Sequence, residues 1–221
     1  MRTIALLAAA LPLAAQPRLL LDTGDFERIR KLAASESWAA GVRDGILRRA
    51  DAWPADHVRQ FGLREWALPP EGAGWSHAYV CPEHGMRLRQ EAGKNLCPVD
   101  GKDYHGWPID NVVYMQRNGD TAHAARDLGL AWQLTRKPVY AEKARRIFSA
   151  YADLYPTLPV HDNNNRRDTR SGARIMSQTL SESSWLIPLV FAYDLARDAL
   201  TAEERARFET RVLRDAAQVI D

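Results

Sequence analysis

The chain has 221 residues, of which 46% are hydrophobic and 26% charged, an ordinary globular composition that suits one domain or one domain with a small insertion. Its 30 basic and 28 acidic residues leave a formal net charge of +2, which excludes the marked basic excess of a nucleic-acid-binding protein. The same balance permits an acidic sugar as substrate, because such a ligand needs only a locally basic groove.

The first residues have the pattern of an export signal. Arg2 supplies a short positive start, residues 4–15 are an apolar run, and Leu13-Ala14-Ala15 offers a small residue before Gln16. A buried N-terminal helix is the alternative. The run is too short to span a bilayer. We therefore expect residues 1–15 to be a cleaved signal peptide, the mature chain to be periplasmic or secreted, and no membrane association after cleavage.

Helical periodicity marks the start of the mature chain. Residues 25–34 follow the potential capping residues Asp22 and Thr23, and residues 36–52 repeat an apolar stripe. Residues 54–109 differ, because they hold six prolines, many glycines and little helical period. This segment is predicted to be a loop-rich insertion of turns and short strands.

Helix returns in the second half of the chain. Apolar periodicity predicts a helix over residues 111–134, and Pro138 suits the first turn of the next helix, which ends near Tyr155-Pro156. A loop follows, then a helix over 173–195, and Thr201 with Glu204 forms a capping box for a last helix reaching about residue 220. Short connections favour antiparallel helix pairs and no strand alternation supports a parallel sheet, so the predicted fold is all-α.

One face of the predicted 173–195 helix is polar without any lysine. At about 100° per residue, Arg174, Gln178, Glu182 and Trp185 fall on the same side. Amide groups could hold sugar hydroxyls and an indole could stack on a sugar ring, so these four residues are candidate substrate-binding groups. A half-exposed helix with a surface ladder of polar side chains is the alternative.

The loop before that helix gathers hydrogen-bonding and cationic side chains in residues 161–167. His161, Asn163 and Arg166 are candidate substrate-binding residues, since an arginine fork can hold a sugar carboxylate. A solvated surface loop without a ligand is the alternative.

A short pattern occurs twice in the loop-rich segment. Cys81-Pro82-Glu83-His84-Gly85 and Cys97-Pro98-Val99-Asp100-Gly101 each place a potential ligand three positions after a cysteine and end on a turn glycine. Two such knuckles make a tetrahedral zinc site, for which Cys81, His84, Cys97 and Asp100 are the candidate ligands. A Cys81–Cys97 disulfide, allowed in an oxidising compartment, and free thiols are the alternatives.

Several segments, in order, resemble the helical domain of heparinase II/III-like and alginate-lyase-like polysaccharide lyases. The resemblance covers nearly all of residues 17–221. The matching segments are residues 17–21, the Cys-Pro-x-x-Gly pair, and residues 124–131, 140–144 and 177–183.

The resemblance implies a fold and a reaction. The fold is a partial (α/α) toroid of antiparallel helical hairpins over residues 16–221, usually followed by β-sandwich domains. The reaction is β-elimination in a uronic-acid-containing polysaccharide, by charge neutralisation and general acid–base catalysis. It requires no cofactor, so the zinc would be structural.

The resemblance also implies an Asn/His pair and a catalytic tyrosine on later helices. After Gln178 the sequence has no histidine, no asparagine and only Tyr193. The main catalytic residues are therefore expected beyond the chain end, in further parts of the same protein, and the 221-residue fragment is expected to be inactive alone. A glycoside hydrolase on a similar helical toroid, with Glu182 as one of two carboxylates, and a non-catalytic sugar-binding module are the alternatives.

Overall fold

The computed structural model describes residues 19–221; the predicted signal peptide lies outside them. The described chain is mainly helical, which confirms the all-α prediction, and none of its helices is long and apolar enough to cross a membrane. The helices and strands are α1 (Thr23–Ser35), α2 (Ser37–Ala52), α3 (Ala55–Gln60), β1 (Arg89–Glu91), β2 (Lys94–Leu96), α4 (Ile109–Thr135), α5 (Pro138–Leu154), α6 (Thr179–Ala196), α7 (Ala202–Phe208) and α8 (Asp215–Ile220), the last two joined by a π-helical stretch, Glu209–Arg214.

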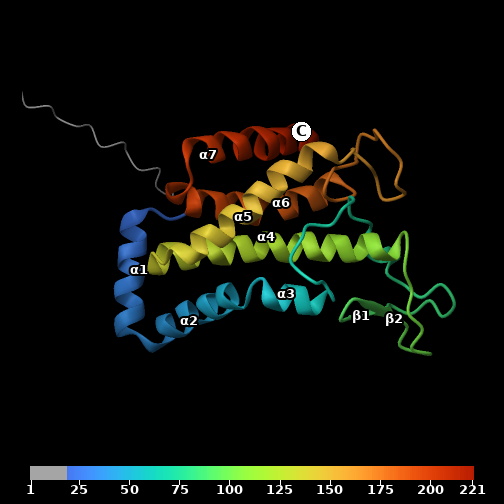
Figure 1. The fold of residues 1–221 in the computed structure, drawn as a ribbon, viewed down its shortest axis with the longest axis horizontal. Coiled ribbons are helices and arrows are strands. Elements are labelled where there is room, and N and C mark those ends of the chain that lie inside the picture. The colour runs from blue at the N-terminus through green and yellow to red at the C-terminus, as the bar shows by residue number, and fades with distance from the viewer. Residues whose placement is uncertain (1–18) are drawn as a thin grey trace, which may run out of the picture.

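The long helix α4 is the axis around which the other helices are arranged. It packs against α1 and α2 on one side and against α5 and α6 on the other, and the C-terminal helices in turn cover α5 and α6 (Figure 1). The β1–β2 hairpin lies at one end of the molecule and α1 at the other. Whether these helices form part of a toroid stays a prediction.

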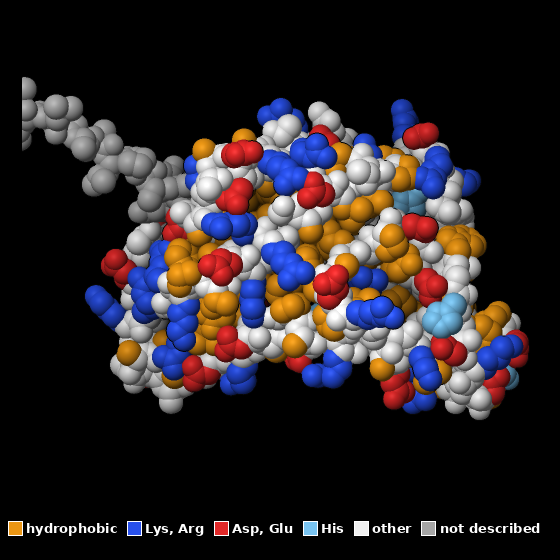
Figure 2. Space-filling view, in the orientation of Figure 1, with side chains coloured by type: hydrophobic (Ala, Val, Ile, Leu, Met, Phe, Trp, Pro, Cys, Tyr) orange, Lys and Arg blue, Asp and Glu red, His pale blue; other side chains and the backbone are white. Residues whose placement is uncertain are grey.

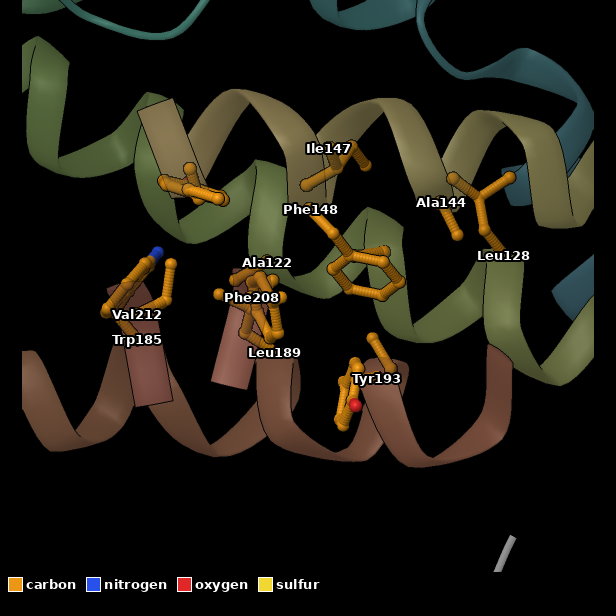
Figure 3. Close-up of a cluster of buried hydrophobic side chains, with 14 of the residues drawn as sticks. Ala122, Leu128, Ala144, Ile147, Phe148, Trp185, Leu189, Tyr193, Phe208 and Val212 are labelled. Atoms are coloured by element: carbon orange, nitrogen blue, oxygen red, sulfur yellow. The ribbon is translucent and has the colours of Figure 1, made fainter. Parts of the chain in front are cut away.

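The core fills the space between α4, α5, α6 and the C-terminal helices. Phe148 of α5 meets Tyr193 of α6 edge-on at a centroid distance of 5.9 Å and lies 4.9 Å from the ring of Phe208 (Figure 3). Leu128 of α4 and Leu189 of α6 are completely buried beside them. Burial of large apolar side chains contributes roughly 1.5–3 kcal/mol each, so this cluster holds the helices together.

Local sequence sets most helix ends. The predicted capping box at the start of α7 is present, with Thr201 and Glu204 bonding each other's backbone N–H groups. A second box, formed by Asp22 and Asp25, begins α1. Pro138 occupies the first turn of α5, as expected. These contacts satisfy N–H groups that a helix start leaves unpaired.

The sequence-based boundaries are wrong in two places. The helix predicted over 173–195 begins only at Thr179, because Ala173 pairs through its backbone with His161 and the carbonyl of Ile175 accepts the Ala73 N–H. This irregular, bent passage buries Ala173 and Ile175 without helix formation. The loop-rich segment also contains the short helix α3, which its proline-rich composition had concealed.

The outer surface carries charges of both signs. In the face shown in Figure 2, basic and acidic side chains alternate, with hydrophobic patches between them. This face therefore offers no extended basic surface, in agreement with the balanced composition.

Close contact between α4 and α6 depends on Gly129. A Cβ atom there would lie 2.8 Å from the Cβ of Leu195 and 3.2 Å from the Ala192 carbonyl oxygen, whereas one at Gly119 of the same helix would meet nothing within 4 Å. Alanine is favoured over glycine inside a helix by roughly 0.5–1 kcal/mol.

We therefore expect Gly129→Ala to lower the free energy of unfolding by about 1–3 kcal/mol through overpacking, and Gly119→Ala to leave it unchanged or raise it slightly. Urea denaturation of the two variants measures both effects. Equal stability of the two variants would contradict the close α4–α6 contact.

Candidate functional site

The four residues predicted to share one helical face do not share it. Arg174 precedes α6, and its guanidinium donates to the carbonyl of Leu158 and lies 6.0 Å from the centre of the Tyr155 ring. Gln178 is the N-cap residue of α6 and donates from Nε2 to the Ser181 hydroxyl at 3.1 Å. The prediction assumed continuous helix from Ala173, and the later start of α6 removes that geometry.

Glu182 is a buried structural anchor, which corrects its interpretation as a sugar contact. Its carboxylate is fully buried and accepts hydrogen bonds from the Met176 N–H and the Tyr155 hydroxyl, each at 2.7 Å. Burial raises the pKa of Glu182, while these donors and the N–H of Ile175 oppose the rise. The side chain ties the bent segment before α6 to the turn that follows α5 and cannot reach a polymer outside.

Trp185 is also part of the core, so the expected stacking of its indole on a sugar is wrong. Its side chain is only 1% exposed. The ring is stacked on Tyr155 with centroids 5.7 Å apart and meets Tyr151 edge-on at 5.0 Å. Trp185 thus packs against two aromatic rings, and these contacts fix the start of α6 against the end of α5.

The 161–167 loop is held by its own side chains. His161 is buried, with Nε2 2.9 Å from the Ala73 carbonyl oxygen. Asn163 accepts a hydrogen bond from the Ser177 hydroxyl at 2.6 Å, and Arg166 pairs with Asp162 at 2.7 Å. The three predicted substrate contacts therefore shape the loop, and a substrate-binding role for them stays a prediction.

Beside this loop lies a concave site of about 360 Å³, here called the loop hollow. Arg167 on its wall is exposed, and no ion pair or side-chain hydrogen bond joins its guanidinium to another residue within 19–221. Asn111 lies opposite on α4 and donates to the Gly72 carbonyl at 2.8 Å. The hollow is lined by Pro70, Glu71, Gly72, Asn111, Thr157, Leu158, Pro159, His161, Asn165 and Arg167.

Sequence reasoning did not single out Arg167 or Asn111. Arg167 follows Arg166 directly, and only the structure shows that Asp162 neutralises the first and not the second. Asn111 stands at the start of a long helix, more than forty positions before the loop, and no local pattern joins the two segments.

A second and larger concave site, here called the α4 hollow, runs along α4 between α3 and α6. Its volume is about 490 Å³. Its lining mixes polar and apolar side chains, the apolar surface being the larger, and the otherwise buried Trp185 forms part of the wall. The hollow is lined by Gln60, Met115, Gln116, Gly119, Asp120, His123, Met176, Ser181, Ser184 and Trp185.

The two Cys-Pro-x-x-Gly loops come together at the hairpin end of the molecule. Cys81 and Cys97 are both buried and free, and each sulfur lies 3.5 Å from Nδ1 of His84. Burial opposes ionisation of Cys81, yet contacts with the Tyr104 hydroxyl, His84 and Cys97 lower its pKa to about 6. The structure thus brings together three of the four predicted ligands, and Asp100 lies next to them, 3.9 Å from His84.

Comparison with known proteins confirms a resemblance to alginate lyases over part of the chain. The chain is 36% identical over 120 residues to an alginate lyase of Stenotrophomonas maltophilia, covering 51% of this chain and 16% of that protein. It is 36% identical over 89 residues to an exo-oligoalginate lyase of Saccharophagus degradans, covering 40% of this chain and 12% of that protein. No family model matches the sequence.

The buried position of Glu182 makes a clear prediction. Glu182→Ala should lower the free energy of unfolding by about 2–5 kcal/mol, because it leaves the Met176 N–H and the Tyr155 hydroxyl buried without an acceptor and opens a cavity. Ser184→Ala, at an exposed position of the same helix, should change stability by less than about 0.5 kcal/mol. Thermal and urea denaturation test the pair, and an unchanged stability of Glu182→Ala would argue for a solvent-facing ligand group instead.

Proposed function

We propose that this chain forms the N-terminal helical part of a polysaccharide lyase that cleaves a uronic-acid-containing polymer by β-elimination. The 36% identity to two proteins named as alginate lyases, from two different bacteria, carries this proposal. The aligned segments span 12–16% of those proteins, so the proposal concerns a protein in which this chain supplies part of the sugar-binding surface.

The reaction needs a base, an acid and a group that neutralises the uronate carboxylate. A base removes the proton at C5 of the uronate, the C4–O bond to the leaving sugar breaks, and an acid protonates the departing oxygen, leaving a C4=C5 double bond. Neutralisation of the C5 carboxylate makes the proton removable, because negative charge develops next to it. Cationic and amide side chains are suited to this last task.

The loop hollow supplies groups of that kind. The unpaired guanidinium of Arg167 can form a fork with a carboxylate, and the amides of Asn165 and Asn111 stand on the same walls. We assign carboxylate binding to Arg167 in preference to Arg166, since Arg166 already pairs with Asp162. No described residue is assigned as the base, and its supply by sequence after Asp221 stays a prediction.

The two alternatives make different use of the same surfaces. A glycoside hydrolase would need two accessible carboxylates, and the buried Glu182 is not one of them. A non-catalytic sugar-binding module would use the hollows without chemistry. The lyase proposal includes two further expectations. The chain is exported, and its partner is an acidic polysaccharide.

The proposal is tested with alginate and a protein that carries residues 16–221 in its natural sequence context. We expect products with ultraviolet absorbance from the new double bond. Arg167→Ala should reduce kcat/KM by roughly 10- to 100-fold, since a hydrogen bond to a charged group contributes about 1.5–3 kcal/mol.

Arg170→Ala is the matched control, because Arg170 is an exposed arginine three positions after Arg167 that does not line the hollow. Its kcat/KM should stay within about twofold of the unsubstituted protein. New reducing ends without ultraviolet absorbance would indicate a hydrolase, and binding without cleavage would indicate a sugar-binding module. Either result contradicts the lyase proposal.

A further inference from the structure

The two Cys-Pro-x-x-Gly segments adopt the same turn. In each, the glycine N–H donates to the cysteine carbonyl, at 2.8 Å for Gly85 and 2.9 Å for Gly101. Both glycines have positive φ, +64° and +73°, a conformation that other residues rarely adopt. The cysteine N–H groups also find equivalent partners, the carbonyls of Met86 and Lys102, at 2.7 and 2.9 Å. Two copies of one loop therefore present their cysteines to a common point.

The ligand atoms at that point have the spacing of a metal site. The sulfurs of Cys81 and Cys97 and a ring nitrogen of His84 lie within 4.8 Å of one another. A tetrahedral zinc ion with Zn–S bonds of about 2.3 Å and a Zn–N bond of about 2.05 Å separates sulfur from nitrogen by roughly 3.5 Å. Both sulfur–nitrogen distances here are 3.5 Å, measured to Nδ1 of His84.

Asp100 stands where the second loop matches His84 of the first, three positions after its cysteine. Its Oδ2 atom is 3.9 Å from Nδ1 of His84, while Oδ1 accepts the Lys102 N–H at 3.0 Å. One oxygen is thus fixed by the turn, and the other lies near His84. Asp100 is therefore the side chain available to complete a set of four ligands.

We propose that Cys81, His84, Cys97 and Asp100 bind one zinc ion in a closed, structural site. Two thiolates, an imidazole and a carboxylate suit zinc, whereas an iron–sulfur cluster is usually held by four cysteines. The Tyr104 hydroxyl, 3.5 Å from the Cys81 sulfur, is placed to donate to that thiolate and orient it.

The ion would support a part of the molecule that has little core of its own. Besides the cysteines, the buried cluster there comprises only Tyr79, Leu88 and two residues of the first turns of α4, Ile109 and Val112. The adjoining sheet has two strands of three residues each. So small a unit rarely holds its shape by apolar burial alone. A zinc ion joining the two turns would fix the segment against α4, and with it Asn111 beside the loop hollow.

The test is metal analysis of the 221-residue chain purified under reducing conditions from zinc-supplemented medium. We expect about one zinc ion per chain. After replacement of zinc by Co²⁺, the visible spectrum should show the intense bands of a tetrahedral ion together with thiolate-to-cobalt charge transfer. Chelation should lower Tm and speed proteolysis within residues 76–108.

Variants separate this site from adventitious binding. Asp100→Ala should weaken zinc binding by at least about 10-fold in competition with a chelator, and His84→Ala should do the same. His84→Cys should retain zinc and strengthen the charge-transfer band, which keeps the test informative if loss of a ligand prevents folding. Glu91→Gln is the matched control, since Glu91 is exposed on β1 and belongs to neither group of possible metal ligands, and the zinc content should not change.

Three results would overturn the proposal. One is a reduced, folded chain that takes up no zinc when the ion is added. Another is unchanged zinc content in both Asp100→Ala and His84→Ala. The third is a Cys81–Cys97 disulfide that forms in the isolated protein and prevents zinc uptake, because it would establish the disulfide alternative in place of the zinc site. None of these measurements depends on lyase activity, so the zinc site can fail while the proposed function holds, and the reverse.

Discussion

The contact between α4 and α6 is the constraint on which the rest of the structure depends. Gly129 lets the two helices approach until Leu195 and Ala192 occupy the space of a missing side chain. That approach brings the aromatic residues of α6 onto α5 and onto the turn after it, where Trp185 stacks on Tyr155. Because protein interiors are close-packed, a wider spacing at this crossing would loosen every layer that rests on it.

Glu182 extends this constraint from the helices to the loops. By accepting the Met176 N–H it fixes the bent segment that replaces the expected first turns of α6. That segment pairs with His161, whose ring in turn contacts the Ala73 carbonyl. A chain of hydrogen bonds thus runs from the core to the wall of the loop hollow. Glu182, the most deeply buried polar group of this chain of contacts, therefore positions the surface.

Periodicity and capping signals were sufficient for the regular elements. The helices around α4 and α5, the Pro138 start and the Thr201 capping box follow from local sequence, because helix ends and apolar stripes are local features. The boundary at Thr179 did not, since backbone pairing between Ala173 and His161 is a tertiary contact that overrides local helical preference. α3 was missed for a different reason, since its six residues are too few for a period to show and they lie in a proline-rich segment.

The candidate site, too, could be predicted from the sequence only in part. The repeated Cys-Pro-x-x-Gly pattern predicted which side chains would meet, because each turn is encoded within five residues. The polar stripe on α6 failed, because polarity alone cannot distinguish a buried anchor such as Glu182 from a ligand group. Arg167 and Asn111 could not be paired from sequence, since their proximity depends on how the 157–178 segment folds back on α4.

We propose that a uronate chain contacts the surface beside the 161–167 loop, and not the buried face of α6. Hydrogen–deuterium exchange of the protein with and without a saturated oligouronate distinguishes the two surfaces. We expect slower exchange in the loop and at the N-terminal end of α4 when the sugar is present, with no change around Glu182 and Trp185. Protection confined to surfaces remote from the loop hollow, or no protection at all at saturating sugar, would contradict it.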